Sequence, residues 1–193
     1  MNFFPKAYAD AVARLRVPSG FLIVVVFAWF SRPTAESLLW GVPVSLAGLA
    51  LRAWAAGCLA KNQQLATGGP YRYTRNPLYV GNIALWVGFA LTARLVWLAP
   101  VILVLLGLEY HAIVRWEEQL LESRLGDAYR DYAARVPRWL PTFNRGGRSE
   151  RGEEESANSA VKHGPYPWRE TLFSERGTLL AIAGGYLLIW LKT

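Results

Sequence analysis

Residues 69–82 read GPYRYTRNPLYVGN, and this polar, turn-rich insert between two apolar segments decides the fold class. The segments on either side of it, 38–60 and 78–93, are each apolar enough to be read as membrane spans. Polar groups are costly beside a bilayer, so an insert of this kind is expected to serve a function at the membrane surface.

The composition of the whole chain agrees with a membrane protein. Of 193 residues, 53% are hydrophobic, nine are tryptophan and only 18% are charged, which is too apolar for an ordinary soluble domain. We therefore predict an all-α, multi-span integral membrane protein, in one membrane domain over residues 1–193. The apolar segments predict about five transmembrane helices: 17–30, 38–60, 78–93, 95 to about 124, and 177–191.

Four parts of this domain are expected to differ in character. Residues 1–60 hold the first two spans, and 61–143 form a core with the insert, a helical hairpin and a cytoplasmic helix. Residues 144–170 are expected to be a flexible linker, because 146–159 are rich in Gly, Ser and Glu. Residues 171–193 hold the last span. Residues 4–15 have helical periodicity that suits either a surface helix or a frayed tail, and the first span lacks a cleavage site and is read as retained.

The distribution of charge gives an orientation. The net charge is +7, and only Asp10 and Glu36 are acidic before Glu109. Lys and Arg concentrate at 6–16, 61–75 and 115–151, while the intervening loops hold only Arg32 and Arg94, so the N-terminus and the polar insert are predicted to be cytoplasmic, in a bacterial cytoplasmic membrane. The basic residues flank apolar segments, which argues against a nucleic-acid partner. The single cysteine excludes an intrachain disulfide and a cysteine zinc site.

The first candidate group begins the third span. Pro77 suits a first helical position, and the free N–H groups of that helix end can receive an anion. Asn76 is expected to cap the helix through its side-chain oxygen, with Arg75 beside it. The alternative is a plain interfacial cap, in which the nearby tyrosines are interfacial aromatics.

The second candidate group is the adjacent pair Glu117 and Glu118. Neighbours on a helix point about 100° apart, so the two carboxylates are not expected to face one pocket equally. The alternative is a pair of solvated, salt-bridged helix faces.

The third candidate group follows at 126–141. A short helix over 127–135 would put Tyr129, Tyr132 and Arg135 near one face. With Arg138, such a face could hold a substrate carboxylate, which arginine binds with two parallel hydrogen bonds. The alternative is an amphipathic helix that packs flat under the membrane.

Taken in order, these motifs resemble the superfamily of isoprenylcysteine carboxyl methyltransferases and phospholipid methyltransferases, integral membrane enzymes that use S-adenosylmethionine. The resemblance covers about residues 38–141, and Asn76 stands where many members carry histidine. The matching residues are Gly69, Pro70, Tyr71, Arg75, Asn76, Pro77, Tyr79, Gly81, Glu117, Glu118, Gly126, Tyr129, Tyr132, Val136, Pro137 and Pro141.

The resemblance implies S-adenosylmethionine as cofactor, held in a cytoplasmic pocket, no metal, and an acceptor that is a membrane lipid or a prenylated or otherwise lipidated molecule. It implies catalytic roles for Arg75, Glu118 and Arg135, and substrate binding by Tyr129, Tyr132 and Arg138. The implied cofactor-binding residues are Gly69, Pro70, Tyr71, Asn76, Pro77, Tyr79, Gly81, Glu117 and Glu118.

The reaction expected from the arginines is O-methylation of a carboxylate, because a carboxylate is already ionised near neutral pH and needs no base. The alternative of N-methylating a phospholipid amine requires a base to remove a proton. An NADPH-dependent lipid reductase is a further alternative, since membrane sterol reductases carry a similar segment, but Leu78 and Asn82 depart from it. A non-enzymatic membrane adaptor is the remaining alternative.

Overall fold

The computed structural model describes residues 18, 20–61, 65–141 and 168–191, and in these ranges the chain is helical with short connections and no strand. A helical segment, Gly20–Phe30, comes first. The other elements are α2 (Ala35–Lys61), η1 (Gly69–Arg72), α3 (Pro77–Ala93), η2 (Val96–Leu98), α4 (Ala99–Leu125), α5 (Asp127–Arg135) and α7 (Trp168–Trp190). The all-α prediction is therefore confirmed. The expected surface helix at 4–15 and residues 144–167 of the expected linker lie outside the described residues, and residues 168–170 of that linker are the first residues of α7.

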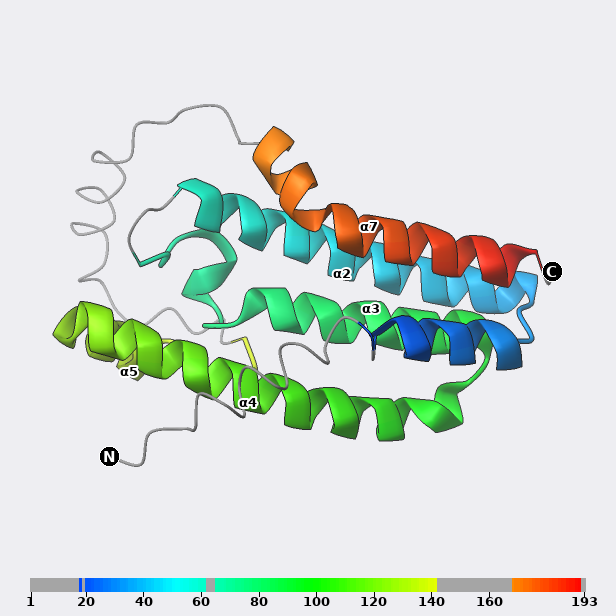
Figure 1. Cartoon of the computed structure of the whole chain (residues 1–193), viewed down its shortest axis with the longest axis horizontal. Helices are drawn as coiled ribbons and strands as arrows, with labels where there is room; N and C mark the ends of the chain where they lie inside the picture. The colour runs from blue at the N-terminus through cyan, green and yellow to red at the C-terminus, as the bar shows by residue number, and fades with distance from the viewer. Residues whose placement is uncertain (1–17, 19, 62–64, 142–167, 192–193) are drawn as a thin grey trace.

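The long helices lie side by side, with α3 between α2 and α4, and α7 along α2 (Figure 1). Buried side chains from Gly20–Phe30, α3, α4 and α7 form one hydrophobic core, to which Phe27, Phe89, Leu106 and Ile189 belong. η1, α5 and the adjacent ends of α2, α3 and α4 lie at one end of the bundle, here called the polar end. The opposite end, here called the turn end, holds the connection between α3 and α4.

This connection forms the helical hairpin that the sequence predicts. Arg94 ends α3 in the left-handed conformation, with φ 57°, and its N–H donates to the carbonyl of Leu91 at 3.1 Å. η2 then leads into α4. The reversal carries α4 back to the polar end, and so brings Glu117 and Glu118 to the start of α3.

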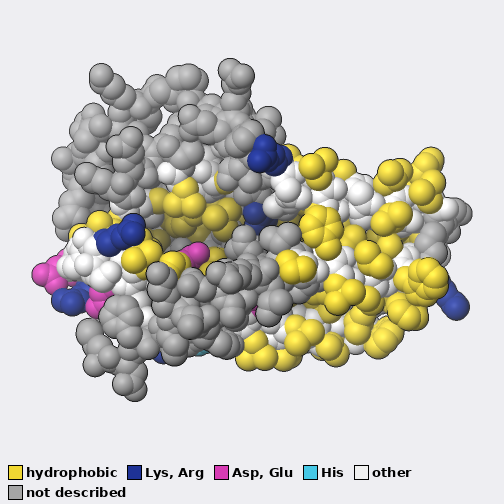
Figure 2. Space-filling view, in the orientation of Figure 1, with side chains coloured by type: hydrophobic (Ala, Val, Ile, Leu, Met, Phe, Trp, Pro, Cys, Tyr) yellow, Lys and Arg dark blue, Asp and Glu magenta, His cyan; other side chains and the backbone are white. Residues whose placement is uncertain are grey.

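The outer surface of the bundle is apolar away from the polar end. Trp29 and Trp97 are 78% and 72% exposed. A space-filling view shows apolar side chains over most of this region, with the acidic side chains toward the polar end and basic side chains also elsewhere, including at the turn end (Figure 2). Two helices, Ala35–Leu59 and Val96–Leu125, are long and apolar enough to cross a membrane. Three apolar helices are shorter: Gly20–Phe30, Pro77–Ala93 and Arg176–Trp190.

α2 and α3 touch backbone to backbone along a line of glycines. A Cβ at Gly48 would lie 2.6 Å from the carbonyl oxygen of Gly81, and a Cβ at Gly88 would lie 2.7 Å from that of Gly41. No side chain fits between the two helices where their backbones approach this closely, so the position of α2 against α3 is tightly fixed.

Polar contacts fasten α7 onto this helix pair. The hydroxyl of Tyr186 donates to Ser45 Oγ at 2.6 Å and lies 3.3 Å from Thr92 Oγ1. The hydroxyl of Ser37 donates to the Thr92 carbonyl at 2.9 Å, which joins α2 to the last turn of α3. These hydrogen bonds satisfy hydroxyl groups that would be costly to bury alone.

Candidate active site

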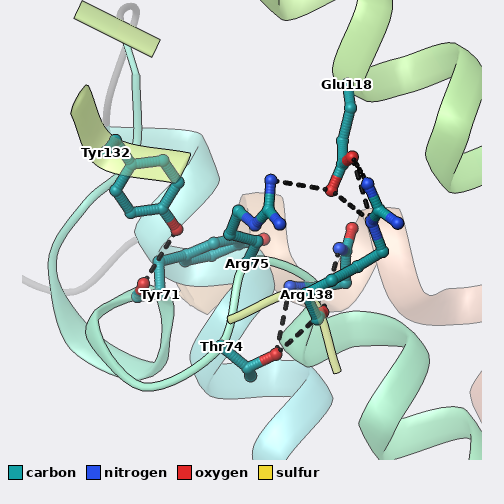
Figure 3. A network of polar contacts seen from close by, with 7 residues as sticks. Tyr71, Thr74, Arg75, Glu118, Tyr132 and Arg138 are labelled. Atoms are coloured by element: carbon teal, nitrogen blue, oxygen red, sulfur yellow. Dashed lines mark hydrogen bonds and ion pairs between the residues drawn. The ribbon is translucent and has the colours of Figure 1, made fainter. Parts of the chain in front are cut away.

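An arginine–glutamate–arginine cluster forms the centre of the polar end (Figure 3). The Glu118 carboxylate accepts from Arg138 Nε at 3.0 Å and from its Nη2 at 2.6 Å, and lies 3.2 Å from Arg75 Nη1. Only 11%, 15% and 27% of the Glu118, Arg75 and Arg138 side chains is exposed. Three segments that are far apart in sequence therefore meet at one carboxylate: the start of α3, the end of α4 and the chain that follows α5.

The charge of this cluster does not balance. Two guanidinium groups face one carboxylate, and hydrogen bonding to Glu118 raises the pKa of Arg138 further above its usual value. Both arginines stay charged. The cluster keeps an excess positive charge in a mostly buried position, which favours a bound anion such as a carboxylate.

Residues 74–76 clamp the segment that carries Arg138. The Thr74 hydroxyl lies 3.1 Å from the carbonyl oxygens of both Arg138 and Trp139, and the Arg75 N–H donates to the Pro137 carbonyl at 2.9 Å. Asn76 Nδ2 donates to the Arg138 carbonyl at 3.1 Å. The predicted Asn76 cap is therefore wrong: its side chain makes no capping bond to α3, because the amide is turned toward residue 138.

Two buried donors of the site have no hydrogen-bond partner, namely the Tyr129 hydroxyl and Arg75 Nε. Only 4% of Tyr129 is exposed, and burial, together with the Glu118 charge, raises the pKa of its hydroxyl, although the neighbouring Arg75 guanidinium opposes that rise. The Tyr129 hydroxyl and Arg75 therefore lie close to each other, but not in the geometry of a hydrogen bond. Buried polar groups in proteins nearly always have partners. Two unpaired donors beside an excess positive charge indicate a place for an acceptor group of a ligand.

Glu117 faces a different part of the site from Glu118, as the sequence predicts. Tyr79 donates its hydroxyl proton to Glu117 Oε1 at 2.9 Å. The Tyr79 ring lies 4.9 Å from that of Tyr110 and 6.5 Å from that of Trp139, centroid to centroid. Glu117 is thus held at the edge of an aromatic cluster, and Glu118 is held by arginines.

The Gly69-Pro70-Tyr71 turn is fixed between α2 and α5. Gly69 has φ 60°, and a Cβ there would lie 2.6 Å from Cys58 Sγ on α2. Tyr132 donates its hydroxyl proton to the Tyr71 carbonyl at 2.8 Å. Burial raises the pKa of both tyrosines, so each is a hydrogen-bond donor near neutral pH and not a base.

Two of the predicted site residues lie away from this cluster. The predicted helix at 127–135 is confirmed, and its tyrosines are buried, but Arg135 is exposed and its Nε donates to the Asp131 carbonyl of its own helix at 3.2 Å. The expectation that Arg135 shares their face is wrong, because Tyr129 and Tyr132 point inward while Arg135 points to solvent. Gly81 faces α2, where a Cβ would lie 2.8 Å from the Gly48 carbonyl oxygen.

Sequence reasoning missed Thr74 and Arg52. Thr74 gives no signal of its own, because its role depends on carbonyl groups more than 60 residues away. Arg52 could have been found from the sequence, because a charged residue inside an apolar helix is a clear signal of a functional or structural role. In the described part of the chain, no three His, Cys, Asp or Glu side chains form a group that could hold a metal ion.

Comparisons with known proteins bear on the segment that builds most of this site. Nickel-cobalt-cadmium resistance protein NccN of Alcaligenes xylosoxydans xylosoxydans is 34% identical over 118 residues, which is 60% of this chain and 54% of that protein. Cobalt-zinc-cadmium resistance protein CzcN of Cupriavidus metallidurans is 34% identical over 103 residues, which is 52% of this chain and 47% of that protein. The chain thus spans about half the length of these curated relatives. No solved structure matches.

The family comparison covers η1, α3, α4 and nearly all of α2. Residues 39–128 match the model of the phospholipid methyltransferase family. Arg75, Tyr79, Glu117 and Glu118 lie inside the match, and Arg138 lies beyond it. The resemblance predicted from the sequence is therefore confirmed for residues 39–128, the segment in which this chain has the pattern of the phospholipid methyltransferases.

Proposed function

We propose that this protein is an S-adenosylmethionine-dependent methyltransferase that acts on a lipid or lipid-linked acceptor at the membrane. The observation that carries the proposal is the cluster of Arg75, Glu118 and Arg138, with the unpaired Tyr129 hydroxyl beside it. The phospholipid methyltransferase pattern over residues 39–128 supports the reaction class. The apolar surface around the bundle supports an acceptor that arrives from the bilayer.

The donors of this site fit the polar groups of S-adenosylmethionine. Its carboxylate suits Arg75 Nε and the Tyr129 hydroxyl, which are buried and unpaired. Its ammonium group suits a carboxylate, and Glu117, which accepts from Tyr79, offers one at the edge of the aromatic cluster. When bound, the cofactor supplies a sulfonium-activated methyl group. The protein then mainly has to align the acceptor and exclude water.

A carboxylate is the favoured acceptor group. Arg75 and Arg138 already hold one carboxylate, that of Glu118, and arginine is suited to bind another. A phospholipid amine is the second candidate, because an amine must lose a proton and Glu117 can accept one. The tyrosines at 71, 129 and 132 are unsuited to that task, since burial raises the pKa of each.

We expect membranes that contain the protein to transfer tritiated methyl groups from S-adenosylmethionine to extracted lipid. Release of the label as methanol in mild base would identify a methyl ester, and label that resists base would identify an N-methyl product. Arg75→Gln and Arg138→Gln are expected to lose most of the activity, whereas Arg124→Gln, on the exposed end of α4, is expected to keep it.

Calorimetric titration of the purified protein with S-adenosylmethionine and NADPH completes this test. We expect binding of the first only. Tight NADPH binding without any response to S-adenosylmethionine would refute the methyltransferase and favour the reductase alternative.

The proposal includes a five-span topology with the N-terminus and the site on the cytoplasmic side. Support comes from four exposed tryptophans at helix ends near the turn end, which is how aromatic side chains gather at a membrane interface. These are Trp29, Trp40, Trp97 and Trp190. Acidic side chains lie toward the polar end, where basic side chains accompany them, as expected of cytoplasmic loops.

Cysteine labelling in intact cells tests this topology. In a Cys58→Ser background, single cysteines replace Arg72, Val96 and Ser123, all of which are exposed. We expect an impermeant reagent to modify the cysteine at 96 and to leave those at 72 and 123 unmodified until the cells are opened. Different accessibility at 72 and 123 would put the two halves of the site on opposite sides of the membrane and contradict a single site.

A further inference from the structure

The chain just before α3 and the chain beyond α5 lie against each other at the centre of the site (Figure 3). Three groups of residues 74–76 donate to main-chain carbonyls of residues 137–139: the main-chain N–H of Arg75, the Thr74 hydroxyl and Asn76 Nδ2. The donors of Thr74 and Asn76 reach the same oxygen, the carbonyl of residue 138, each at 3.1 Å. These hydrogen bonds therefore fix the position of the backbone from which the Arg138 side chain extends.

The side-chain amide of Asn76 serves this contact between the two segments. A carbonyl oxygen can only accept, so the amide must present its nitrogen to it. Asn76 is 8% exposed, and its side chain makes no capping bond to α3. The resemblance to the methyltransferases implies that Asn76 binds the cofactor, whereas this hydrogen bond joins its nitrogen to the backbone of the protein itself.

The position of residue 138 sets the spacing of the two arginines in the cluster. Arg75 Nη1 lies 3.2 Å from Oε1 of Glu118, and Arg138 Nη2 lies 2.6 Å from Oε2. The two guanidinium groups are thus spaced to bind the two oxygens of one carboxylate, and paired contacts of this kind add geometric specificity to the binding energy. A shift of the backbone at residue 138 would move one guanidinium relative to the other and change this spacing.

We propose that Asn76 is a positioning residue, which holds the backbone of residue 138 so that Arg138 and Arg75 keep the spacing suited to one carboxylate. Asn76 then acts on a substrate only through Arg138, and it does not bind the cofactor. Thr74 shares the task through its hydroxyl. The inference rests on the proposed function in one respect, namely that Arg138 receives the methyl acceptor.

The nuclear magnetic resonance signal of the Arg138 Nε–H tests this positioning without any methyl transfer. The full chain is produced with isotopically labelled arginine and studied in detergent micelles, and the signal that is missing from Arg138→Lys identifies the group. In the native protein this N–H donates to Glu118 at 3.0 Å. We expect Asn76→Ala to shift the signal and to speed exchange of its proton with water, because the guanidinium no longer meets Glu118 in the same geometry.

Asn82→Ala is the matched control for the loss of an amide. Asn82 lies further along α3, and its side-chain oxygen accepts from Arg52 of α2, so we expect its loss to leave the Arg138 signal unchanged. An Arg138 signal that is unchanged in Asn76→Ala, or that shifts equally in both variants, would overturn the proposal. If Asn76→Ala does not fold, Asn76→Leu, which keeps the bulk of the side chain, is judged by the same two outcomes.

Methyl transfer to extracted lipid distinguishes positioning from cofactor binding. Asn76→Ala is expected to lower the rate at low lipid concentration by about tenfold or more, since misplacing a group by about 1 Å can cost about a hundredfold. The calorimetric affinity for S-adenosylmethionine is expected to equal that of the native protein. Weakened cofactor binding with an unchanged dependence on lipid would assign Asn76 to the cofactor and contradict the positioning role.

The effects of Asn76→Ala and Arg138→Gln are not expected to add, because Asn76 acts through Arg138. Asn76→Ala introduced into Arg138→Gln should lower the rate of methyl transfer no further. A further loss as large as that in the native background would mean that Asn76 acts by another route, and the proposal would fall.

Asn76→His tests whether the N–H of this side chain is what matters. Imidazole Nδ1 is bonded to Cγ, as the amide nitrogen of asparagine is, so it can bring an N–H to the same carbonyl. Near pH 8, where imidazole is mostly neutral, we expect this variant to recover most of the rate that Asn76→Ala loses. A rate as low as that of the alanine variant would refute a role for the donor.

The two kinds of measurement separate this inference from the proposed function. A protein in which Asn76→Ala shifts the Arg138 signal, but which neither binds S-adenosylmethionine nor methylates lipid, would keep the positioning of the arginine pair by Asn76 and refute the methyltransferase. A native protein that methylates lipid, with an Arg138 signal that Asn76→Ala does not change, would keep the methyltransferase and refute the positioning.

Discussion

Replacing Glu118 with alanine is expected to lower the free energy of unfolding by about 3 kcal/mol, the range seen when one partner of a buried ion pair is removed. The substitution leaves Arg75 and Arg138 facing each other, mostly buried, without the carboxylate that both contact. Reversible unfolding in mixed micelles, followed by circular dichroism, measures the change. Glu122→Ala is the matched control, because its partner Arg130 is exposed to solvent and little stability is expected to depend on that pair.

A double-mutant cycle assigns this loss to the cluster. Arg138→Met removes one of the two positive charges and keeps most of the apolar stem. The double variant Glu118→Ala, Arg138→Met is therefore expected to lose less stability than the two single losses added together, with a coupling energy of about 1–3 kcal/mol. Additive losses, or equal small effects of Glu118→Ala and Glu122→Ala, would contradict a buried cluster and favour solvated faces on α4.

Gly88→Ala is expected to destabilise the protein by about 2–3 kcal/mol, because the added methyl group has no space. Its Cβ would lie 2.6 Å from the backbone nitrogen of Ser45 and 2.7 Å from the carbonyl oxygen of Gly41. Backbone atoms of two packed helices cannot move aside as the end of a flexible side chain can. The melting temperature in detergent is therefore expected to fall by several degrees.

Gly107→Ala is the control for this substitution. Gly107 also lies inside a helix, but nothing is within 4 Å of a Cβ at this position. Alanine is expected to stabilise α4 there by up to about 1 kcal/mol through its higher helix propensity. If both glycine substitutions change stability by the same amount, the close backbone packing of α2 against α3 at Gly88 is refuted.

The elements of the fold were predictable because each has a local signal. Pro77 starts α3 as a proline at a first helical position should, and Arg94 marks the reversal between two apolar helices. The helix of residues 127–135 is found at its expected bounds. The glycines of the contact between α2 and α3 recur seven residues apart, at 41 and 48 and at 81 and 88, but the sequence does not say which helix meets which.

The partners within the site were harder to predict, because they depend on where the chain turns after α5. Arg135 and Arg138 are close in sequence and equally basic. Val136 is extended, with φ −110° and ψ 126°, and this ends α5 and returns the chain toward α4. Arg138 thereby reaches Glu118, while Arg135 is left on the outer face of its helix. Helical spacing predicts contacts of Glu118 only with its neighbours on α4. It does not predict a contact with Arg138, which is 20 residues further along the chain.

The clamp on residues 137–139 links the binding of an anion to the mobility of the chain. α5 follows directly on α4 at its first residue. Beyond its last residue, the chain is held by the ion pair between Arg138 and Glu118 and by hydrogen bonds from Thr74 and Asn76 to the Arg138 carbonyl. An anion that takes the place of Glu118 on Arg138 weakens one of these fastenings. Thermodynamic linkage then requires the reverse effect as well: a change that loosens the contacts of residues 137–139 raises the affinity of the site for the anion. Anion binding and the order of α5 therefore report on the same equilibrium.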